Sequence, residues 1–441
     1  MANASDNSPF RGLGGMKAIV DCNNFYCSCE RLFKPHLDRK PVVVLSNNDG
    51  CIISRSNEAK KLGVEMAGPY FKAKPLIEKY DVAVFSSNYN LYGDLSWRVM
   101  ETLRILLGKN KVEVYSVDEA FLDLSIFPEN ELPAIAEKIK KIVETWTGIK
   151  VSVGVAPTKV LAKVANRLSK KYVQQYNGVM VLNSKEKIIA ALKQTEVGDI
   201  WGIGYQYAQK LKEQWSIYDA LQLSRMSEEF GKIYLGGVVG SRLLRELKGI
   251  PSKDMEEELV KKRMIATTRM FGNPVGDIAS IKEAVATYTS RAAEKLRRQH
   301  SAASIINVFV VSKSENHAVD FRGATSSKSI TLPAATSFTN ELIKPAVELV
   351  DTLFNEGTLY KKAGVILSGI VPDNSIQGNL FVAESKNSER KLMDMIDNVN
   401  FSQRDDVLKF AASGTTRNWK MQQNFISDRY TTRWNELFEV K

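Results

Sequence analysis

The stretch Val112–Leu124, VEVYSVDEAFLDL, places two adjacent carboxylates, Asp118 and Glu119, between two short apolar runs. Each run, 112–117 and 120–124, is rich in Val, Phe and Leu, which predicts two strands with the acidic pair at the turn between them. Neighbouring carboxylates on a rigid hairpin repel each other, and a divalent cation relieves that repulsion. Because every ligand would be an oxygen, Mg²⁺ or Mn²⁺ fits best. A solvated acidic turn would be the better explanation of such a pair standing alone.

A third carboxylate, Asp21, closes another apolar strand, predicted over 16–22. With residues 27–87 set aside as an insertion, the predicted order is strand 16–22, a helix from about 88, the hairpin, a helix 132–146 and a strand 149–155. This is the β-α-β-β-α-β split order, an antiparallel sheet with two helices on one face. In that topology the strands that carry Asp21 and Asp118 are neighbours. The three carboxylates are therefore predicted to form one metal site.

The composition is that of an ordinary globular protein, with 44% hydrophobic and 25% charged residues, and a length of 441 residues predicts two to four domains. No apolar run approaches the roughly 20 residues needed to span a membrane, so no membrane association is expected. The first apolar run contains Lys17 and then meets Asp21, which argues against a secretory signal. Residues 1–15 are polar and are expected to form a flexible extension.

The charge balance favours a polyanionic partner. Lys and Arg number 61 against 50 Asp and Glu, which gives a net charge of +11, and nucleic acid is the simplest such partner. The four cysteines lie within the first 51 residues, and Cys27 and Cys29 form a C-x-C with no second pair, so a zinc site is not expected. Free thiols in a reducing cytoplasm are the expected state.

A helix that starts at Pro157 carries a basic stripe opposite an apolar face. The stripe consists of Lys159, Lys163, Arg167 and Lys170, at positions i, i+4, i+8 and i+11. A charge stripe is usually a solvated face. Here four like charges gain nothing from one another and acidic partners are absent from the stripe, so an anionic ligand is the preferred explanation.

Two further segments point to phosphate. Gly202-Ile203-Gly204, between two short predicted helices, resembles a helix-hairpin-helix, and Lys210 follows it. Such a turn can hold a phosphate on backbone N–H groups, although Gly-x-Gly turns are common. A later unit repeats the β-α-β-β-α-β order over 265–367, and Arg291 and Arg298 add positive charge near the end of its first helix. Complementing the helix dipole is the alternative role of that charge.

After Val371 the chain becomes polar. Its exposed hydrophobic side chains are expected to dock onto another surface; they include Leu380, Phe381, Trp434 and Phe438.

Five motifs occur in one fixed order: Asp21-x-Asn-x-Phe-Tyr26, Ser116-Val-Asp-Glu-Ala-Phe121, the lysine-rich helix, the Gly202-Ile-Gly204 hairpin and a late basic α/β unit. That order resembles the Y-family translesion DNA polymerases. Longer runs, namely KPVVVLSNNDGCIISRS, FSSNYNLYGD, YSVDEAFLDL, RAAEKLR and RYTTRW, look like the bacterial UmuC subfamily. The resemblance covers residues 16–441.

The resemblance implies template-directed, error-prone DNA synthesis in the bacterial DNA-damage (SOS) response, with primed template DNA and deoxynucleotides as substrates. Asp21, Asp118 and Glu119, aided by the backbone carbonyl of Cys22, would hold two Mg²⁺ ions. Tyr26 would be the steric gate that excludes the ribose 2′-hydroxyl.

The resemblance also assigns the triphosphate and DNA contacts. Lys60, Lys170 and Asn57 match triphosphate-binding positions, although many family members have tyrosine in place of Asn57 and arginine in place of Lys60. The residues expected to contact DNA are Lys159, Lys163, Gly202, Gly204, Lys210, Arg291 and Arg298.

The fold implied is an α+β right-hand polymerase with a split palm, small fingers, a helical thumb and an α/β little finger. The expected boundaries are 16–26 with 88–181 for the palm, 27–87 for the fingers, 182–252 for the thumb, 262–370 for the little finger and 371–441 for a partner-binding tail. A small fingers domain implies a roomy site with few contacts to the base pair.

Partners follow from the same resemblance. Gln377, Leu380 and Phe381 resemble the pentapeptide by which bacterial polymerases bind the sliding clamp, and a processed UmuD dimer and RecA are implied as further partners. The implied location is the bacterial cytoplasm, at the nucleoid during DNA damage. Two alternatives remain open: a two-metal nucleotide cyclase, and a non-catalytic DNA-binding scaffold with a structural acidic hairpin.

Overall fold

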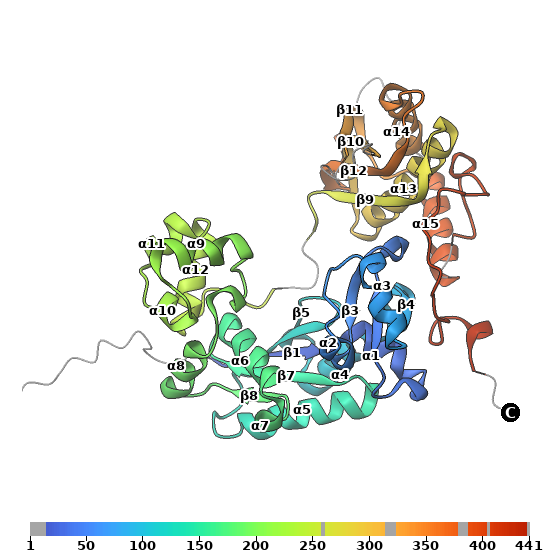
Figure 1. Ribbon diagram of the computed structural model, residues 1–441. Coiled ribbons are helices and arrows are strands. Elements are labelled where there is room, and N and C mark those ends of the chain that lie inside the picture. The colour runs from blue at the N-terminus through green and yellow to red at the C-terminus, as the bar shows by residue number, and fades with distance from the viewer. Residues whose placement is uncertain (1–14, 257–260, 314–322, 378–386, 404–405, 439–441) are drawn as a thin grey trace, which may run out of the picture.

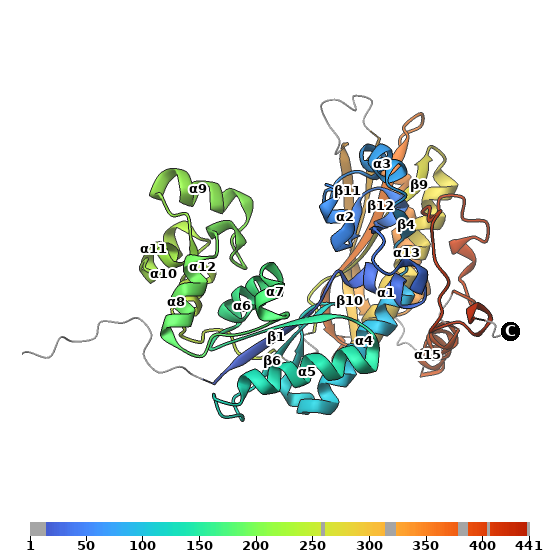
Figure 2. The same cartoon turned by 60° about the horizontal axis from the view of Figure 1, so that its bottom comes forward.

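A computed structural model describes residues 15–256, 261–313, 323–377, 387–403 and 406–438 (Figure 1). The predicted N-terminal extension therefore lies almost wholly outside the described residues. Three sheets, a helical unit and a C-terminal segment make up the molecule. In both views the helical unit α8–α12 lies at one end, apart from the three-stranded sheet and from the unit built on β9–β12 (Figure 1, Figure 2).

A five-stranded sheet carries the acidic hairpin. Its strands, in spatial order, are β5 (Val112–Val114), β6 (Glu119–Asp123), β1 (Lys17–Cys22), β7 (Val151–Ala156) and β8 (Val179–Val181). β1 pairs antiparallel with β6 and β7, and β7 pairs parallel with β8. The predicted split order and the neighbouring positions of the first strand and the hairpin are confirmed. Two details of the prediction were wrong: β5 ends at Val114 because the next residues form the turn, and β8 was not expected.

Helices cover both faces of this sheet, which explains why its strands read as continuous apolar runs. α4 (Tyr89–Leu107) and α5 (Leu132–Thr147) share one core with Ala18 and Val20 of β1. α6 (Lys159–Lys171) covers the other face, where it packs with Ile19 and Phe121, and the short α7 (Val173–Tyr176) follows it. Alternate residues of β1 thus serve two different cores.

A three-stranded sheet forms within the predicted insertion. Its order is β3 (Ile52–Arg55), β2 (Val42–Leu45) and β4 (Ala83–Ser86), with β2 and β4 parallel. The helices around it are α1 (Phe25–Leu32), α2 (Asn57–Lys61) and α3 (Tyr70–Lys79). Neither α1 nor α3 was predicted from the sequence. α1 follows β1 directly, so it carries residues of the first motif away from the sheet.

The helical unit is continuous with the core beneath α6. It contains α8 (Lys185–Lys193), α9 (Tyr205–Trp215), α10 (Ala220–Ser224), α11 (Glu228–Tyr234) and α12 (Val238–Leu247). The buried Glu246 of α12 accepts hydrogen bonds from the backbone N–H of Val160, at the start of α6, and of Ser252 and Lys253 in the linker that follows. A carboxylate at the N-terminus of α6 also suits the helix dipole. α6 therefore joins the helical unit to the sheet.

The late unit has the predicted order and one four-stranded antiparallel sheet, β11-β10-β12-β9. Its elements are β9 (Ile265–Val275), α13 (Ile278–Arg298), β10 (Ser301–Ser312), β11 (Thr325–Thr336), α14 (Thr339–Leu353) and β12 (Tyr360–Pro372). Side chains of α13 and α14 share one core with Ile306, Val308 and Val310 of β10, so the opposite face of the sheet stays open.

The C-terminal segment leaves this unit and returns to the first part of the chain. α15 (Asn387–Ser402) lies beside α13, and the residues after it run past α13 to β4 and α1 (Figure 1, Figure 2). Two single turns, Ala411–Ser413 and Trp434–Glu436, interrupt an otherwise irregular path. All four cysteines are free. None of the helices that the structure describes has the length and apolar content needed to cross a membrane.

The contact between β7 and α6 generates the first prediction. A Cβ on Gly154 would lie 2.3 Å from the backbone oxygen of Ala162 and the backbone nitrogen of Asn166, both in α6. Backbone atoms cannot move aside cheaply, so we expect Gly154→Ala to lower the free energy of unfolding by about 3 kcal/mol.

Gly93→Ala in α4 is the matched control, because nothing lies within 4 Å of the added Cβ. This change should be neutral or stabilising by up to about 1 kcal/mol. Urea unfolding followed by tryptophan fluorescence measures both. Equal stabilities for the two variants would contradict the close packing of α6 on β7.

Candidate active site

The carboxylates of the acidic hairpin and of β1 meet at one corner of the five-stranded sheet. Asp21 and Glu119 are directly opposite each other in the β1–β6 register, and the backbone N–H of Cys22 donates to the carbonyl of Asp118 at 2.8 Å. Asp118 is the last turn residue before β6. Burial raises the pKa of Glu119, and the adjacent Asp21 raises it further. Like charges placed opposite each other destabilise a sheet, so the corner needs positive charge.

Two lysines of α6 supply that charge. The ammonium of Lys163 lies 2.6 Å from Glu119 Oε1, and that of Lys170 lies 2.9 Å from Asp21 Oδ2. Their seven-residue spacing places both on one helix face, two turns apart. Among the described residues, no group of three or more His, Cys, Asp or Glu side chains is gathered closely enough to hold a metal ion. A cation bound here would take over the contacts that the two ammonium groups make.

The chemistry of the corner nevertheless fits a hard divalent cation. Its donors are carboxylate oxygens from Asp21, Asp118 and Glu119, and such ligands suit Mg²⁺. The hydroxyl of Ser116 donates to Asp118 Oδ1 at 2.6 Å and orients this carboxylate within the turn. Ser116 is a supporting residue that sequence analysis did not select as a site residue, although it stands two positions before the acidic pair.

The basic stripe of α6 proves to be paired along its whole length, from other elements. Lys159 is buried against Glu113 at 2.5 Å and donates to the carbonyl of Asp254, while Arg167 pairs with Asp199. The argument that the stripe lacks acidic partners holds within the helix, but the tertiary structure supplies one carboxylate for each cation. Lys159, expected to contact DNA, is placed in the interior.

Tyr26 lies on the first turn of α1, next to the corner. Its ring stacks on Tyr92 of α4 with centroids 4.6 Å apart and planes at 19°, and it meets Tyr89 edge-on at 6.0 Å. Burial raises the pKa of Tyr26 to about 12, so the hydroxyl is neutral at physiological pH. Neither Tyr89 nor Tyr92 was selected from the sequence. Their spacing with Leu91 and Leu95 reads as an ordinary helix face.

Lys60 and Asn57 lie on α2, beside Asn24, the N-cap of α1. Lys60 donates to Asn24 Oδ1 at 2.7 Å and to Asn57 Oδ1 at 3.3 Å. Burial lowers the pKa of Lys60, and the nearby charges of Arg55 and Lys170 lower it further. The positive charge of Lys170 and the negative charge of Asp21 both influence Lys60. Asn24, which adopts a left-handed backbone at φ 46°, is a site residue that sequence analysis missed.

The Gly202–Gly204 turn is exposed at the edge of the helical unit. Gly202 has φ +101° and Gly204 is the N-cap of α9, whose exposed face carries Lys210. Trp201 reaches the acidic hairpin, where its ring N–H donates to the Tyr115 hydroxyl at 3.2 Å. The N–H of Ile203 donates to the Ile200 carbonyl at 2.9 Å, and phosphate binding at this turn stays a prediction.

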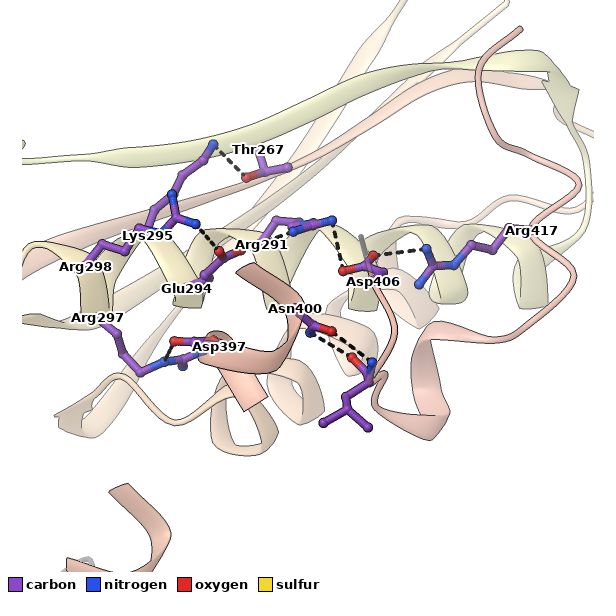
Figure 3. Close-up of polar contacts among 11 residues, drawn as sticks. Thr267, Arg291, Glu294, Lys295, Arg297, Arg298, Asp397, Asn400, Asp406 and Arg417 are labelled. Carbon is purple, nitrogen blue, oxygen red and sulfur yellow. Dashed lines mark hydrogen bonds and ion pairs between the residues drawn. The ribbon is translucent and has the colours of Figure 1, made fainter. Parts of the chain in front are cut away.

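The basic end of α13 is engaged by the C-terminal segment (Figure 3). Arg291 pairs with Asp406 at 2.9 Å, and Arg298 pairs with Glu294 at 2.6 Å. Arg297 makes two contacts of 2.7 Å with Asp397 of α15. A role of Arg291 and Arg298 in DNA binding stays a prediction, and these ion pairs offer another reason for the cluster. Of the residues expected to bind the sliding clamp, Gln377 is exposed, whereas Leu380 and Phe381 lie outside the described residues.

Family comparisons cover most of the chain. The impB/mucB/samB family matches residues 20–167, and its C-terminal domain matches residues 262–380. Residues 390–440 match a domain of unknown function, DUF4113. The last match coincides with the segment that contacts α13, β4 and α1.

Individual relatives match over nearly the whole length. Protein UmuC of Salmonella typhimurium is 39% identical over 97% of this chain and 100% of that protein. Protein MucB of Escherichia coli is 32% identical, covering 96% and 99%. DNA polymerase IV of Brucella melitensis is 30% identical over 81% of this chain and 76% of that protein.

Solved structures share the fold at lower identity. A Y-family DNA polymerase chimera matches with a TM-score of 0.65 and 22% identity, over 81% of this chain and 99% of that chain. An insertion ternary complex of Dbh DNA polymerase matches with a TM-score of 0.54 and 23% identity, with the same coverage.

The pairing of α6 generates the second prediction. The Lys159–Glu113 side chains are 4% and 7% exposed, whereas Lys170 is 38% exposed in its pair with Asp21. We expect Lys159→Met to lower the free energy of unfolding by about 3–5 kcal/mol, because a buried carboxylate would lose its counter-ion.

Lys170→Met, on the same helix, should cost no more than about 1 kcal/mol. Urea unfolding of the two variants gives the comparison. If Lys159→Met cost as little as Lys170→Met, Lys159 would not have the interior role described above.

Proposed function

The chain belongs to the impB/mucB/samB family, and on this premise we propose that it is a UmuC-type DNA polymerase of the error-prone translesion class. Template-directed extension of a primer 3′ end by deoxynucleotides is its reaction. The observation that carries the proposal is the corner where the β1–β6 register brings Asp21 and Glu119 together, beside Asp118 and two lysines. This corner supplies what phosphoryl transfer needs: cation ligands and positive charge for phosphates.

The fold of the chain is that of the Y-family DNA polymerases, and the predicted α+β right-hand architecture is confirmed. We propose that the five-stranded sheet is the palm, the three-stranded sheet the fingers, the helical unit the thumb and the four-stranded unit the little finger. The boundaries proposed are those expected from the sequence. The three-stranded sheet is small, and the hydrophobic core of its own contains few buried residues besides Val43, Leu45 and Ile52. A small cover over the nascent base pair suits a polymerase that tolerates damaged templates.

Asp21, Asp118 and Glu119, with the backbone carbonyl of Cys22, would hold two Mg²⁺ ions. Such ions supply activation of the primer hydroxyl and stabilisation of the leaving pyrophosphate. When Lys163 pairs with Glu119 and Lys170 with Asp21, the positive charges of the lysines offset the repulsion between the carboxylates. Lys170, Lys60 and Asn57 would bind the triphosphate; the ion pair of Lys170 with Asp21 and the hydrogen bond of Lys60 with Asn57 support this assignment.

Tyr26 acts as the steric gate in this proposal. Its ring follows the end of β1 by one short turn, and the stacking on Tyr92 holds it in one orientation. A 2′-hydroxyl on an incoming sugar would meet this ring, whereas a 2′-hydrogen would not. The gate thus works by exclusion of volume and needs no ionised phenol.

DNA would lie between the helical unit and the four-stranded unit. At the first, Gly202, Gly204 and Lys210 can bind backbone phosphates without reading bases. At the second, the open face of the sheet carries Thr268, Asn307 and Lys362, which are polar and at least partly exposed. The net charge of +11 favours such a path.

We also propose the partners that the sequence implied. Gln377 begins a segment of clamp-binding type, and a processed UmuD dimer and RecA are proposed because UmuC-type sequences imply them. Action on damaged chromosomal DNA would place the enzyme in the bacterial cytoplasm, at the nucleoid. Membership of this family does not favour a cyclase or a non-catalytic scaffold.

Isosteric changes at the corner test the reaction. Asp118→Asn and Glu119→Gln should lower primer extension by at least about 10³-fold, because they remove the anionic ligands while they preserve shape. Affinity for primed DNA should change by less than about threefold. Metal-dependent incorporation on a primed template, measured by gel, and DNA binding, measured by fluorescence anisotropy, check both.

Glu137→Gln on the exposed face of α5 is the matched control and should leave extension unchanged. Full activity of both corner variants would sink the polymerase assignment. A wild-type protein that fails to bind primed DNA would favour the cyclase, and one that binds DNA without incorporation would favour the scaffold.

A change at Tyr26 tests the gate separately. Tyr26→Ala should raise ribonucleotide insertion relative to deoxynucleotide insertion by about 10²-fold or more, because the excluded volume is removed. Tyr26→Phe keeps the ring and should retain the wild-type preference. Single-nucleotide kcat/KM values for a matched ribonucleotide and deoxynucleotide give the ratio. An unchanged ratio in Tyr26→Ala would refute the gate.

A further inference from the structure

Residues 424–430 of the C-terminal segment lie against the β4 end of the three-stranded sheet. The backbone N–H of Ser86 donates to the carbonyl of Phe425 at 2.9 Å, and the N–H of Phe425 donates back to the Ser86 hydroxyl at 2.9 Å. The N–H of Asn424 donates to Asp49 Oδ2 at 2.8 Å. A segment that follows α15 by more than twenty residues is thus held against β4 at Ser86.

The same segment fixes the start of α4. Asn88 is the N-cap of that helix, and its Oδ1 accepts from the N–H of Leu91 at 3.3 Å. Its amide donates to the Ser427 carbonyl at 3.0 Å, to the Ser427 hydroxyl at 3.1 Å and to the Asp428 carbonyl at 3.2 Å. The capping side chain is therefore oriented from both sides.

Ser427 also reaches a buried carboxylate on α1. Glu30 is fully buried, and its Oε1 accepts from the Ser427 hydroxyl at 3.0 Å and from the Tyr92 hydroxyl at 2.6 Å. Burial raises the pKa of Glu30, and the two hydrogen bonds oppose that change. Two donors from distant parts of the chain thus converge on one oxygen, and Oε2 has no partner among the described residues. Such a buried polar cluster costs more than apolar packing unless its geometry is held.

Tyr92 connects this cluster to the active site. One end of its side chain is fixed by Glu30, and its ring face stacks on Tyr26. Tyr89, one turn earlier on α4, meets both rings edge-on. A second contact holds the far end of α1, where Phe33 stacks on Tyr430 of the C-terminal segment at 4.6 Å. The orientation of Tyr26 therefore depends on how α1 and α4 are held together.

We propose that the C-terminal segment positions the steric gate: Ser427, through Glu30 and Tyr92, holds the Tyr26 ring where it excludes the 2′-hydroxyl. This inference rests on the proposed role of Tyr26. It gives the region that matches a domain of unknown function a part in sugar discrimination, and it makes Ser427, Glu30 and Tyr92 positioning residues. Displacement of a positioned group by about 1 Å can change a rate by about 10²-fold, so a hydrogen-bond network that sets the position of the Tyr26 ring is sufficient to matter.

The test compares insertion of a ribonucleotide with that of the matched deoxynucleotide, using the full-length chain. Ser427→Ala and Tyr92→Phe each remove one hydroxyl donor to Glu30 and keep the surrounding packing. For each, the ratio of kcat/KM for the deoxynucleotide to kcat/KM for the ribonucleotide should fall by about tenfold, through faster ribonucleotide insertion, while deoxynucleotide insertion changes by less than about threefold. Trp434→Ala is the matched control in the same segment, since its side chain is 91% exposed, and it should leave the ratio unchanged.

Two further variants separate positioning from a merely structural role. Glu30→Gln still offers an oxygen to both hydroxyls and should retain most of the wild-type ratio. Ser427→Ala added to Tyr26→Ala should change the ratio no further, because both act through one ring and their effects are not additive. Substitution of a residue with only a structural role would lower the melting temperature of the protein and slow insertion of both nucleotides alike.

The outcomes distinguish this inference from the proposed function. If Tyr26→Ala loses discrimination while Ser427→Ala and Tyr92→Phe stay within about twofold of the wild-type ratio, the polymerase and its gate stand and the positioning role is overturned. If Tyr26→Ala keeps the wild-type ratio, or if the wild-type chain inserts no deoxynucleotide, the proposed function fails and the inference fails with it. A lowered ratio in both positioning variants, absent in Trp434→Ala, supports the inference.

Discussion

The charge balance between two strands and one helix is the constraint on which the active site depends. Antiparallel pairing of β1 and β6 puts Asp21 directly opposite Glu119, an arrangement that like charges disfavour. Lys163 and Lys170 offset this repulsion from α6, and in the proposed reaction bound cations would do the same. The sheet register and the position of α6 are thus coupled through the site itself.

α6 can perform this role because it is held firmly on three sides. Its apolar face shares a core with Ile19 and Phe121 of the sheet and with the helical unit. Glu246 binds its N-terminus, and the buried Lys159–Glu113 pair closes the first turn. The free-energy cost of burying these charges is offset only when their geometry is well defined, so the first turn of α6 is held in one position. Lys163 and Lys170, on the next turns, therefore project from a fixed helix. Catalytic groups that must meet substrate within a fraction of an ångström need such support.

The C-terminal segment adds a second set of restraints, between units that the chain order leaves far apart. Its acidic residues Asp397 and Asp406 neutralise the basic end of α13 (Figure 3). Farther along, it pairs with β4, supports the cap of α4 and contacts Glu30. One segment therefore links the four-stranded unit to the helices that flank Tyr26. This linking role gives a purpose to polar, partly exposed residues of the C-terminal segment whose contacts look unimportant when each is considered alone.

The sequence by itself determined the two split β-α-β-β-α-β units, the neighbouring positions of the strands that carry Asp21 and Asp118, and the family. Periodicity over helices such as α4 and α6, and alternation in the strands, are local properties, and the topology follows from a short list of allowed connections. It did not reveal α1 or α3, whose short stretches lack a clear period, nor β8, whose three residues are too few to show one.

Only the tertiary structure decided what the charges do. Lys159, Lys163, Arg167 and Lys170 look alike along the chain, yet Lys159 is interior, and Lys163 and Lys170 pair with the carboxylates of Glu119 and Asp21. Likewise, nothing local connects Ser427 with Glu30, which is 397 positions away. Pairing between distant charges depends on which elements share a core, and hydrogen bonds have no sequence period, so these contacts could be read only once the chain was folded.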